Sequence, residues 1–147
     1  MAISSFAPRR RLFLASALAA LAETELIAQA GASGKVGKLT VEEAVLKPDT
    51  IPAKDVISGN PRAGDLVFSK SPDSREIRGI WSCTRGSFHW TFDTDETAVI
   101  LHGRVTVQME DGTSLELKQG DVALFPQGLK SIWMIHEDLR KVYVLYG

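Results

Sequence analysis

The chain has 147 residues, of which 44% are hydrophobic and 24% charged, and its formal net charge at pH 7 is −1. This length and composition predict one soluble globular domain with a core of its own. The near-zero charge excludes a general electrostatic attraction to nucleic acid or to an anionic membrane. Cys83 is the single cysteine, so an internal disulfide and a cysteine-based zinc site are excluded. Its strand-like surroundings favour a small buried residue over a reactive thiol.

Residues 1–30 have the layout of a secretory signal. Three arginines at 9–11 precede an apolar run over 12–22, and Ala28 and Ala30 offer a cleavage site with small residues. The residues Arg-Arg-Leu-Phe-Leu at 10–14 resemble the twin-arginine export pattern. The apolar run is shorter than the roughly 20 residues of a membrane-spanning helix. We expect export to the periplasm with no membrane insertion; the alternative is a retained N-terminal helix on a cytoplasmic protein.

Residues 31–58 are predicted to be a linker followed by a short helix. Glycine, serine and lysine at 31–38 are typical of a flexible joint. Thr40 is a candidate helix N-cap, with Glu43 three residues later in a capping-box arrangement. Pro48 and Pro52 would end this helix.

From residue 59 to 147, short strand-like runs alternate with turn signals. Residues 104–110 alternate strictly between polar and apolar side chains, and Asp111-Gly112 predicts a tight hairpin. Short strands without a helical period predict an all-β sandwich or barrel. The expected strands are Leu66–Ser69, Glu76–Thr84, Ser87–Phe92, Thr97–Leu101, Arg104–Glu110, Ser114–Leu117, Val122–Phe125, Ser131–Ile135 and Arg140–Tyr146.

The spacing of two motifs around this hairpin resembles the cupin signature. The first is Glu96-x6-Gly103 and the second is Gly120-x5-Pro126-x-Gly128. Other residues narrow the resemblance to the cupins that include ureidoglycine aminohydrolase-like and ethanolamine-utilisation domains: Gly79-Ile-Trp81, Gly86-x-Phe88-x-Trp90, Trp133 and Arg140-Lys141-x-Tyr143. The resemblance covers about residues 59–146. It implies a double-stranded β-helix, or jelly-roll barrel, that forms a homodimer, preceded by a mostly irregular or helical extension.

The resemblance also implies where a metal site would lie. Metal-binding cupins have a His-x-His pair, a glutamate and a further histidine, and the matching positions hold His89, Thr91, Glu96 and Ser131. Threonine and serine are poor ligands for a transition metal, and two remaining ligands rarely hold one firmly. We therefore expect no firmly held metal, with a weakly held divalent ion as the alternative. Without metal, His89 could act as a general base beside Glu96, or simply line the barrel.

Strand alternation predicts which side chains share a face. On residues 87–92, His89 and Thr91 share one face and Trp90 lies on the other. If His89 faces the barrel cavity, Trp90 faces away, into a sheet-packing or dimer surface. Trp133 has the same parity as Ser131 and is expected in the His89 cavity.

Three more residues are expected to line this cavity. Trp81 is expected beside Trp133, although a buried tryptophan is more often a core residue than a ligand platform. Lys141 and Tyr143 share a face of the last strand. An inward Lys141 would need a carboxylate partner, for which Glu96 is the candidate; a surface position is the alternative.

Three functions follow from these patterns. The preferred one is a small cupin that binds a small polar metabolite in the barrel without a complete metal-ligand set. The alternative is a hydrolase- or isomerase-like enzyme for a small nitrogenous metabolite, using His89 and Glu96. The third is a structural dimer subunit whose cavity is filled by Trp81 and Trp133. No motif for phosphate binding, for a catalytic nucleophile or for nucleic-acid binding is present in the sequence.

Overall fold

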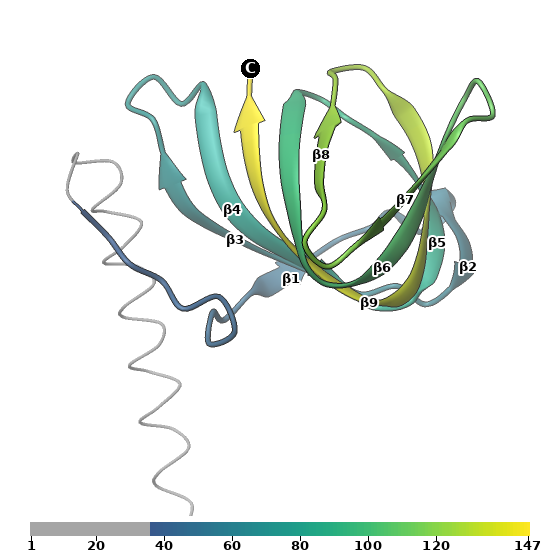
Figure 1. Cartoon of the computed structure of the whole chain (residues 1–147), viewed down its shortest axis with the longest axis horizontal. Helices are drawn as coiled ribbons and strands as arrows, with labels where there is room; N and C mark the ends of the chain where they lie inside the picture. The colour runs from purple at the N-terminus through teal and green to yellow at the C-terminus, as the bar shows by residue number, and fades with distance from the viewer. Residues whose placement is uncertain (1–35) are drawn as a thin grey trace, which may run out of the picture.

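A computed structural model describes residues 36–147 of the chain, and these residues form one curled antiparallel sheet with the shape of a half-barrel (Figure 1). The export signal expected in residues 1–30 lies outside the described residues. The all-β architecture expected from the sequence is confirmed. The strands are β1 (Lys47–Asp49), β2 (Val56–Gly59), β3 (Ala63–Lys70), β4 (Glu76–Cys83), β5 (Gly86–Thr91), β6 (Asp95–Met109), β7 (Ser114–Lys118), β8 (Val122–Phe125) and β9 (Lys130–Tyr146).

The order of the strands makes β9 the centre of the sheet. The main path runs β1-β3-β4-β9-β5-β2, and β6 pairs with β7, β8 and β9. The first half of β9 therefore lies between β5 and β6, and its second half lies between β4 and β6. The one helical turn among residues 36–147 is a three-residue 3-10 helix at Ala53–Asp55. Within this part of the chain, no helix has the length and apolar character needed to cross a membrane.

Strands β6 and β9 are each longer than the sequence predicted. The expected breaks near residue 103 and over 136–139 are instead irregularities within continuous strands, because the β6–β9 register shifts three times between Ile100 and Val105. Gly103 has a φ of +86°, and a Cβ there would lie 2.3 Å from the carbonyl oxygen of Asp138. A glycine thus lets the two strands turn the corner of the barrel together without ending.

The short helix predicted after Thr40 does not form, and the segment instead makes a hydrogen-bonded turn. The amide nitrogens of Glu43 and Ala44 donate to the carbonyls of Thr40 and Val41, over 3.2 and 3.3 Å, and the chain then enters β1. The apolar side chains of this segment pack outside the sheet on Leu66 and Ile80 instead of continuing a helix. Strand β1 pairs with β3 and β2 pairs with β5. Part of the expected linker therefore belongs to the sheet.

The core lies on the concave inner face of the sheet. It is built largely from aromatic rings: Phe92 stacks on Phe125 with centroids 4.6 Å apart, and Trp133, only 1% exposed, contacts both. Between the strands, the predicted hairpin at Asp111-Gly112 is confirmed, with Gly112 at a φ of +85°. Large buried rings and a β-branched inner face account for the closed packing of this half-barrel.

Cys83 is buried within this core, as expected. Burial raises the pKa of its thiol to about 12. The thiolate, which is the reactive form, is therefore scarce at neutral pH.

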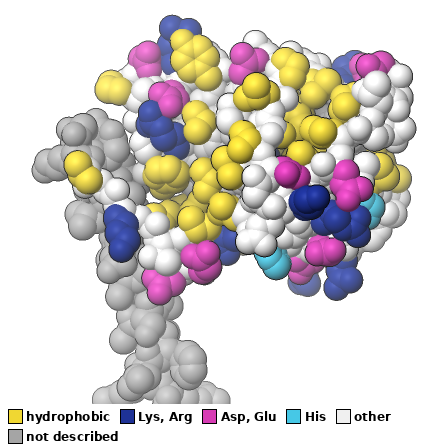
Figure 2. Space-filling model, viewed as in Figure 1, with side chains coloured by type: hydrophobic (Ala, Val, Ile, Leu, Met, Phe, Trp, Pro, Cys, Tyr) yellow, Lys and Arg dark blue, Asp and Glu magenta, His cyan; other side chains and the backbone are white. Residues whose placement is uncertain are grey.

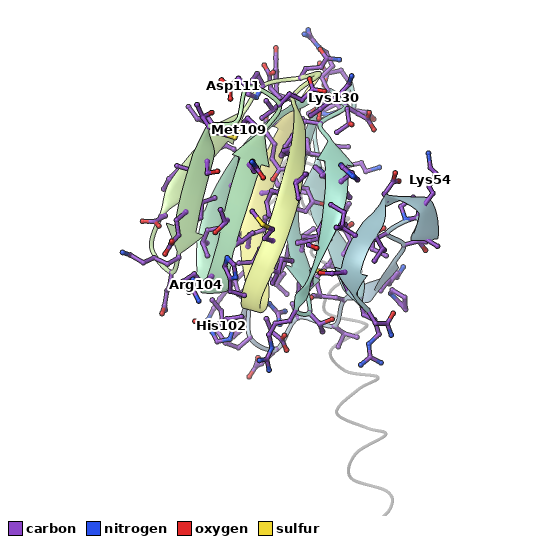
Figure 3. All side chains as sticks on the ribbon, turned by 90° about the vertical axis from the view of Figure 1, so that its right-hand side faces the viewer. Lys54, His102, Arg104, Met109, Asp111 and Lys130 are labelled. Carbon is purple, nitrogen blue, oxygen red and sulfur yellow. The ribbon has the colours of Figure 1, made fainter. Side chains whose placement is uncertain are left out.

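Outside the packed core, several large hydrophobic side chains are exposed on the surface. Figure 2 shows hydrophobic side chains across the face that β3, β4, β9, β6 and β8 present in Figure 1. Val122 and Leu124 of β8 are 64% and 76% exposed. Figure 3 shows Met109, Asp111 and Lys130 at one end of the barrel and His102 and Arg104 at the other.

Candidate functional site

A cavity of about 190 Å³ opens on the inner face of the sheet. Residues from six strands, β1, β3, β4, β5, β6 and β9, meet there, and both halves of β9 contribute to the lining. All three tryptophans of the chain lie in its wall. The lining residues are Asp49, Asp65, Trp81, Phe88, Trp90, Glu96, Trp133, Lys141, Tyr143 and Leu145.

The most buried polar feature of the cavity is an ion pair between Lys141 and Glu96. The Nζ atom of Lys141 contacts Oε1 of Glu96, and the two side chains are 5% and 7% exposed. The same ammonium lies 5.1 Å from the ring centroid of Trp81 and 4.9 Å from that of Trp133. A charge removed from water in this way needs such partners, because desolvation of an unpaired ion is costly. The cavity therefore contains a fixed cation and a fixed anion.

A second polar pair joins β9 to β3. The hydroxyl of Tyr143 donates to Oδ1 of Asp65 over 2.7 Å. Burial raises the pKa of Asp65 and also that of Tyr143, for which the hydrogen bond to Asp65 is the next cause. Gly79 makes room for the tyrosine ring, since a Cβ at this position would lie 2.2 Å from Cζ of Tyr143. The glycine at position 79 of β4 thus leaves the space that lets the Tyr143 hydroxyl reach Asp65.

The third polar group comes from β1, at the edge of the sheet. Oδ2 of Asp49 accepts a hydrogen bond from Nε1 of Trp81 over 3.1 Å, and its Oδ1 accepts from the amide of Thr50 over 2.8 Å. These two bonds hold both the carboxylate and the indole ring in place. The edge strand therefore contributes an acidic group to the cavity.

The structure corrects the expected orientation of β5. Phe88 is 1% exposed, and Phe88 and Trp90 line the cavity, whereas His89 and Thr91 are exposed on the opposite face. Burying the aromatic rings removes far more apolar surface from water than burying a histidine and a threonine would. His89 and Glu96 consequently do not meet.

The other expected cavity residues divide between two places. Trp81, Trp133, Lys141 and Tyr143 lie in the wall of the cavity. Thr91 and Ser131 lie, with His89, along a separate depression near the end of the barrel that also includes Met109 and Lys130 (Figure 3). The hydroxyl of Ser131 donates to the carbonyl of Trp90 over 3.2 Å, so it serves the strand pairing.

These positions do not fit a cupin metal centre. Of the two ligand-type side chains, Glu96 is paired with Lys141 and His89 lies outside the cavity. Among residues 36–147, no group of three or more histidine, cysteine, aspartate or glutamate side chains is placed to hold a metal ion. A stable transition-metal site needs three or four such ligands.

Five lining residues were not anticipated from the sequence as part of the cavity: Asp49, Asp65, Phe88, Trp90 and Leu145. Trp90 was expected to face away from the cavity, and Phe88 lies on the same face of the strand by alternation. The signal that identifies both is their aromatic character. Asp65 follows Ala63-Gly64 in a segment with the composition of a turn. Asp49 follows Pro48 in a segment with the composition of a linker. Nothing local in the sequence marks either aspartate as part of a cavity.

Two solved structures with TM-scores above 0.5 support the fold. Among solved structures, the chain is similar to a putative ethanolamine utilization protein Q from Salmonella typhimurium, with 25% identity and a TM-score of 0.52 over 58% of this chain and 69% of that one. It is also similar to a protein of unknown function from Pseudomonas syringae, with 25% identity and a TM-score of 0.64 over 69% of this chain and 44% of that one. A DUF861 family protein from Thermotoga maritima is 42% identical over 46% of this chain and 76% of its own, with a TM-score of 0.45.

The family comparison covers the central strands. No curated protein matches the chain. The narrower likeness to ureidoglycine aminohydrolases stays a prediction. The family of EutQ-like cupin domains, however, matches the chain over residues 70–143, which is half of its length. The matched range includes the Glu96–Lys141 pair and all three tryptophans. The chain therefore belongs to the family of EutQ-like cupin domains.

Proposed function

We propose that this cupin binds a small polar metabolite in the inner cavity, without a firmly held metal ion, and that Lys141 and Glu96 orient the ligand. The observation that carries the proposal is a buried ion pair in an aromatic-walled cavity. Buried ion pairs contribute little to stability compared with apolar residues of the same volume. In a cavity, however, an ammonium and a carboxylate offer a donor and an acceptor to a bound molecule.

The size of the cavity limits the ligand. Its volume of about 190 Å³ is roughly that of six water molecules in the liquid. It is smaller than the pockets that hold drug-sized molecules, which start at about 300 Å³. The ligand is therefore a small metabolite with one apolar side for the rings and a polar group for the ion pair.

The alternative is a hydrolase- or isomerase-like enzyme that acts on a small nitrogenous metabolite. Its working pair would be Glu96 and Lys141 in place of Glu96 and His89, because the lysine is the group that contacts the glutamate inside the cavity. A carboxylate and an amine in direct contact can exchange a proton with a bound substrate. Turnover of a compound that binds would favour this alternative.

Intrinsic fluorescence tests the binding proposal directly, because every tryptophan of the chain lines the cavity. We expect at least one compound in a panel of small polar metabolites to change the tryptophan emission and raise the melting temperature. The response should disappear in the folded double variant Glu96→Leu/Lys141→Met and persist in His89→Ala, which alters only the outer depression.

Two results would overturn the proposal. One is a panel in which no compound changes emission or melting temperature. The other is stoichiometric metal in the purified wild-type protein that is lost in His89→Ala, since this would assign the outer histidine to a metal site.

A further inference from the structure

The charges that line the cavity do not balance. Three carboxylates, Asp49, Asp65 and Glu96, face one ammonium, that of Lys141. Lys141 and Glu96 neutralise each other, and neither aspartate has an ion-pair partner among residues 36–147. Their hydrogen-bond donors, the Trp81 indole and the Tyr143 hydroxyl, are uncharged. The side of the cavity nearest β1 and β3 therefore carries negative charge without a counterion.

The remaining walls are suited to a cation. The faces of aromatic rings attract positive charge through their quadrupoles. Lys141 already shows this for Trp81 and Trp133, with its ammonium about 5 Å from both ring centroids. No cation of residues 36–147 lies over Phe88 or Trp90, which are also in the wall.

Trp81 connects the acidic and the aromatic sides. Its indole nitrogen donates to Asp49, and its ring centroid lies 6.3 Å from that of Trp90 and 6.5 Å from that of Phe88. A small ligand beside Trp81 can therefore reach a carboxylate and an aromatic face at the same time. Two carboxylates alone would not indicate the chemical class of the ligand. Two carboxylates beside aromatic faces in one cavity do indicate it.

We propose that the metabolite bound in this cavity is a small organic cation of the alkylammonium class, held by Asp49 and Asp65 against the aromatic walls. This inference rests on the proposed binding function and specifies its ligand. An anion would approach two uncompensated carboxylates and an ammonium that Glu96 already neutralises. An uncharged ligand would leave both aspartates without a counterion in a partly desolvated site.

Three probes of similar shape test the sign of the charge: tetramethylammonium, tert-butanol and pivalate. Each is titrated at constant ionic strength into the full-length protein, with binding followed by tryptophan fluorescence and by calorimetry. We expect tetramethylammonium to bind about tenfold or more tighter than tert-butanol, since one desolvated cation–π contact supplies a difference of this order. Pivalate should bind more weakly than either.

Two isosteric variants test the carboxylates. Asp49→Asn and Asp65→Asn each remove a charge but keep an oxygen that accepts the hydrogen bond from Trp81 or Tyr143. We expect each to weaken tetramethylammonium binding about tenfold. Asp93→Asn is the matched control, because it removes the same charge from an exposed residue outside the cavity lining and should leave binding unchanged.

Equal binding of tert-butanol or pivalate, or no binding of tetramethylammonium, would overturn the cation proposal, as would unchanged binding in both cavity variants. These outcomes are separate from failure of the proposed function. A neutral or anionic metabolite that binds through Lys141 and Glu96 would leave that function standing, whereas a silent metabolite panel would remove both.

Discussion

Strands β6 and β9 and the turns beside them form two lysine–glutamate pairs whose surroundings differ sharply. Lys141 and Glu96 meet inside the cavity with side chains 5% and 7% exposed. Lys130 and Glu110 meet near the end of the barrel, 3.6 Å apart, with side chains 62% and 69% exposed. The outer pair lines the depression that holds His89, Thr91 and Ser131.

The contrast teaches that burial, and not residue type, distinguishes the candidate site. Exposed charges interact through water and salt, which screen them strongly. Buried charges interact through a medium of lower effective dielectric constant, so each one constrains its neighbours. The outer depression contains residues at cupin ligand positions. The inner cavity contains the buried charges, whose electrostatic interactions with a ligand are less screened by water.

The largest effect is expected when each pair is broken at its glutamate. Glu96→Gln leaves the Lys141 ammonium buried beside a neutral amide, and it should lower the free energy of unfolding by about 3–5 kcal/mol. Glu110→Gln is the matched change in the exposed pair and should lower it by less than about 1 kcal/mol. Urea denaturation of both variants measures the difference.

The double variant Glu96→Leu/Lys141→Met sharpens this test. Removing both charges together leaves no unpaired ion, so stability should return toward that of the wild type. A loss equal to the sum of the losses in Glu96→Leu alone and Lys141→Met alone would contradict the assignment of a buried, mutually dependent pair. Similar losses for Glu96→Gln and Glu110→Gln would contradict the comparison itself.

A smaller effect is expected from adding one methyl group to the inner face. In Gly79→Ala the new Cβ would lie 2.2 Å from Cζ of Tyr143, so the ring must move and its hydrogen bond to Asp65 must lengthen or break. Overpacking of this kind lowers the free energy of unfolding by about 1–3 kcal/mol. Thermal and urea denaturation measure the loss.

Shortening the partner side chain provides the control. In Gly79→Ala/Tyr143→Val the clash is removed, so the added methyl should be less costly than it is in the wild-type background. Strictly additive losses would show that Tyr143 is not the group that Gly79 accommodates.

The sequence predicted the strands well, because their signals are local. Alternation over residues 104–110 and the turn at Asp111-Gly112 each depend on neighbours in the chain. The continuity of β6 and β9 was missed, because His102-Gly103 reads as a strand end. In the structure, Gly103 instead supplies the positive φ that the bend requires.

The site was harder to predict, because it depends on distant contacts. Alternation shows that His89 and Trp90 lie on opposite faces of β5 but does not say which face is inner. The cupin motif favoured His89, and the aromatic rings decided the outcome. Lys141 and Glu96 are separated by 45 residues, and Trp81 and Asp49 by 32, so only the folded sheet brings either pair together.

The smallest expected effect concerns the acidic side of the cavity. Burial is the largest cause that raises the pKa of Asp65 above its ordinary value of 3.8; Asp49 adds to the rise, while Tyr143 and Lys141 oppose it. The folded protein therefore binds the Asp65 proton more tightly than the unfolded chain does. Stability from this group is present below pH 3.8 and is lost as the pH rises through the folded-state pKa.

This sign predicts opposite responses to one substitution in two assays. At neutral pH, Asp65→Asn should be slightly more stable than the wild type, with an advantage that shrinks as the pH falls toward 3.8. Tetramethylammonium should stabilise the wild type more than the variant, because the bound cation compensates the ionised carboxylate. Denaturation at a series of pH values, with and without the cation, measures both. A variant that is less stable than the wild type at neutral pH would contradict this sign, because it would show that the ionised Asp65 carboxylate stabilises the fold in the absence of a cation.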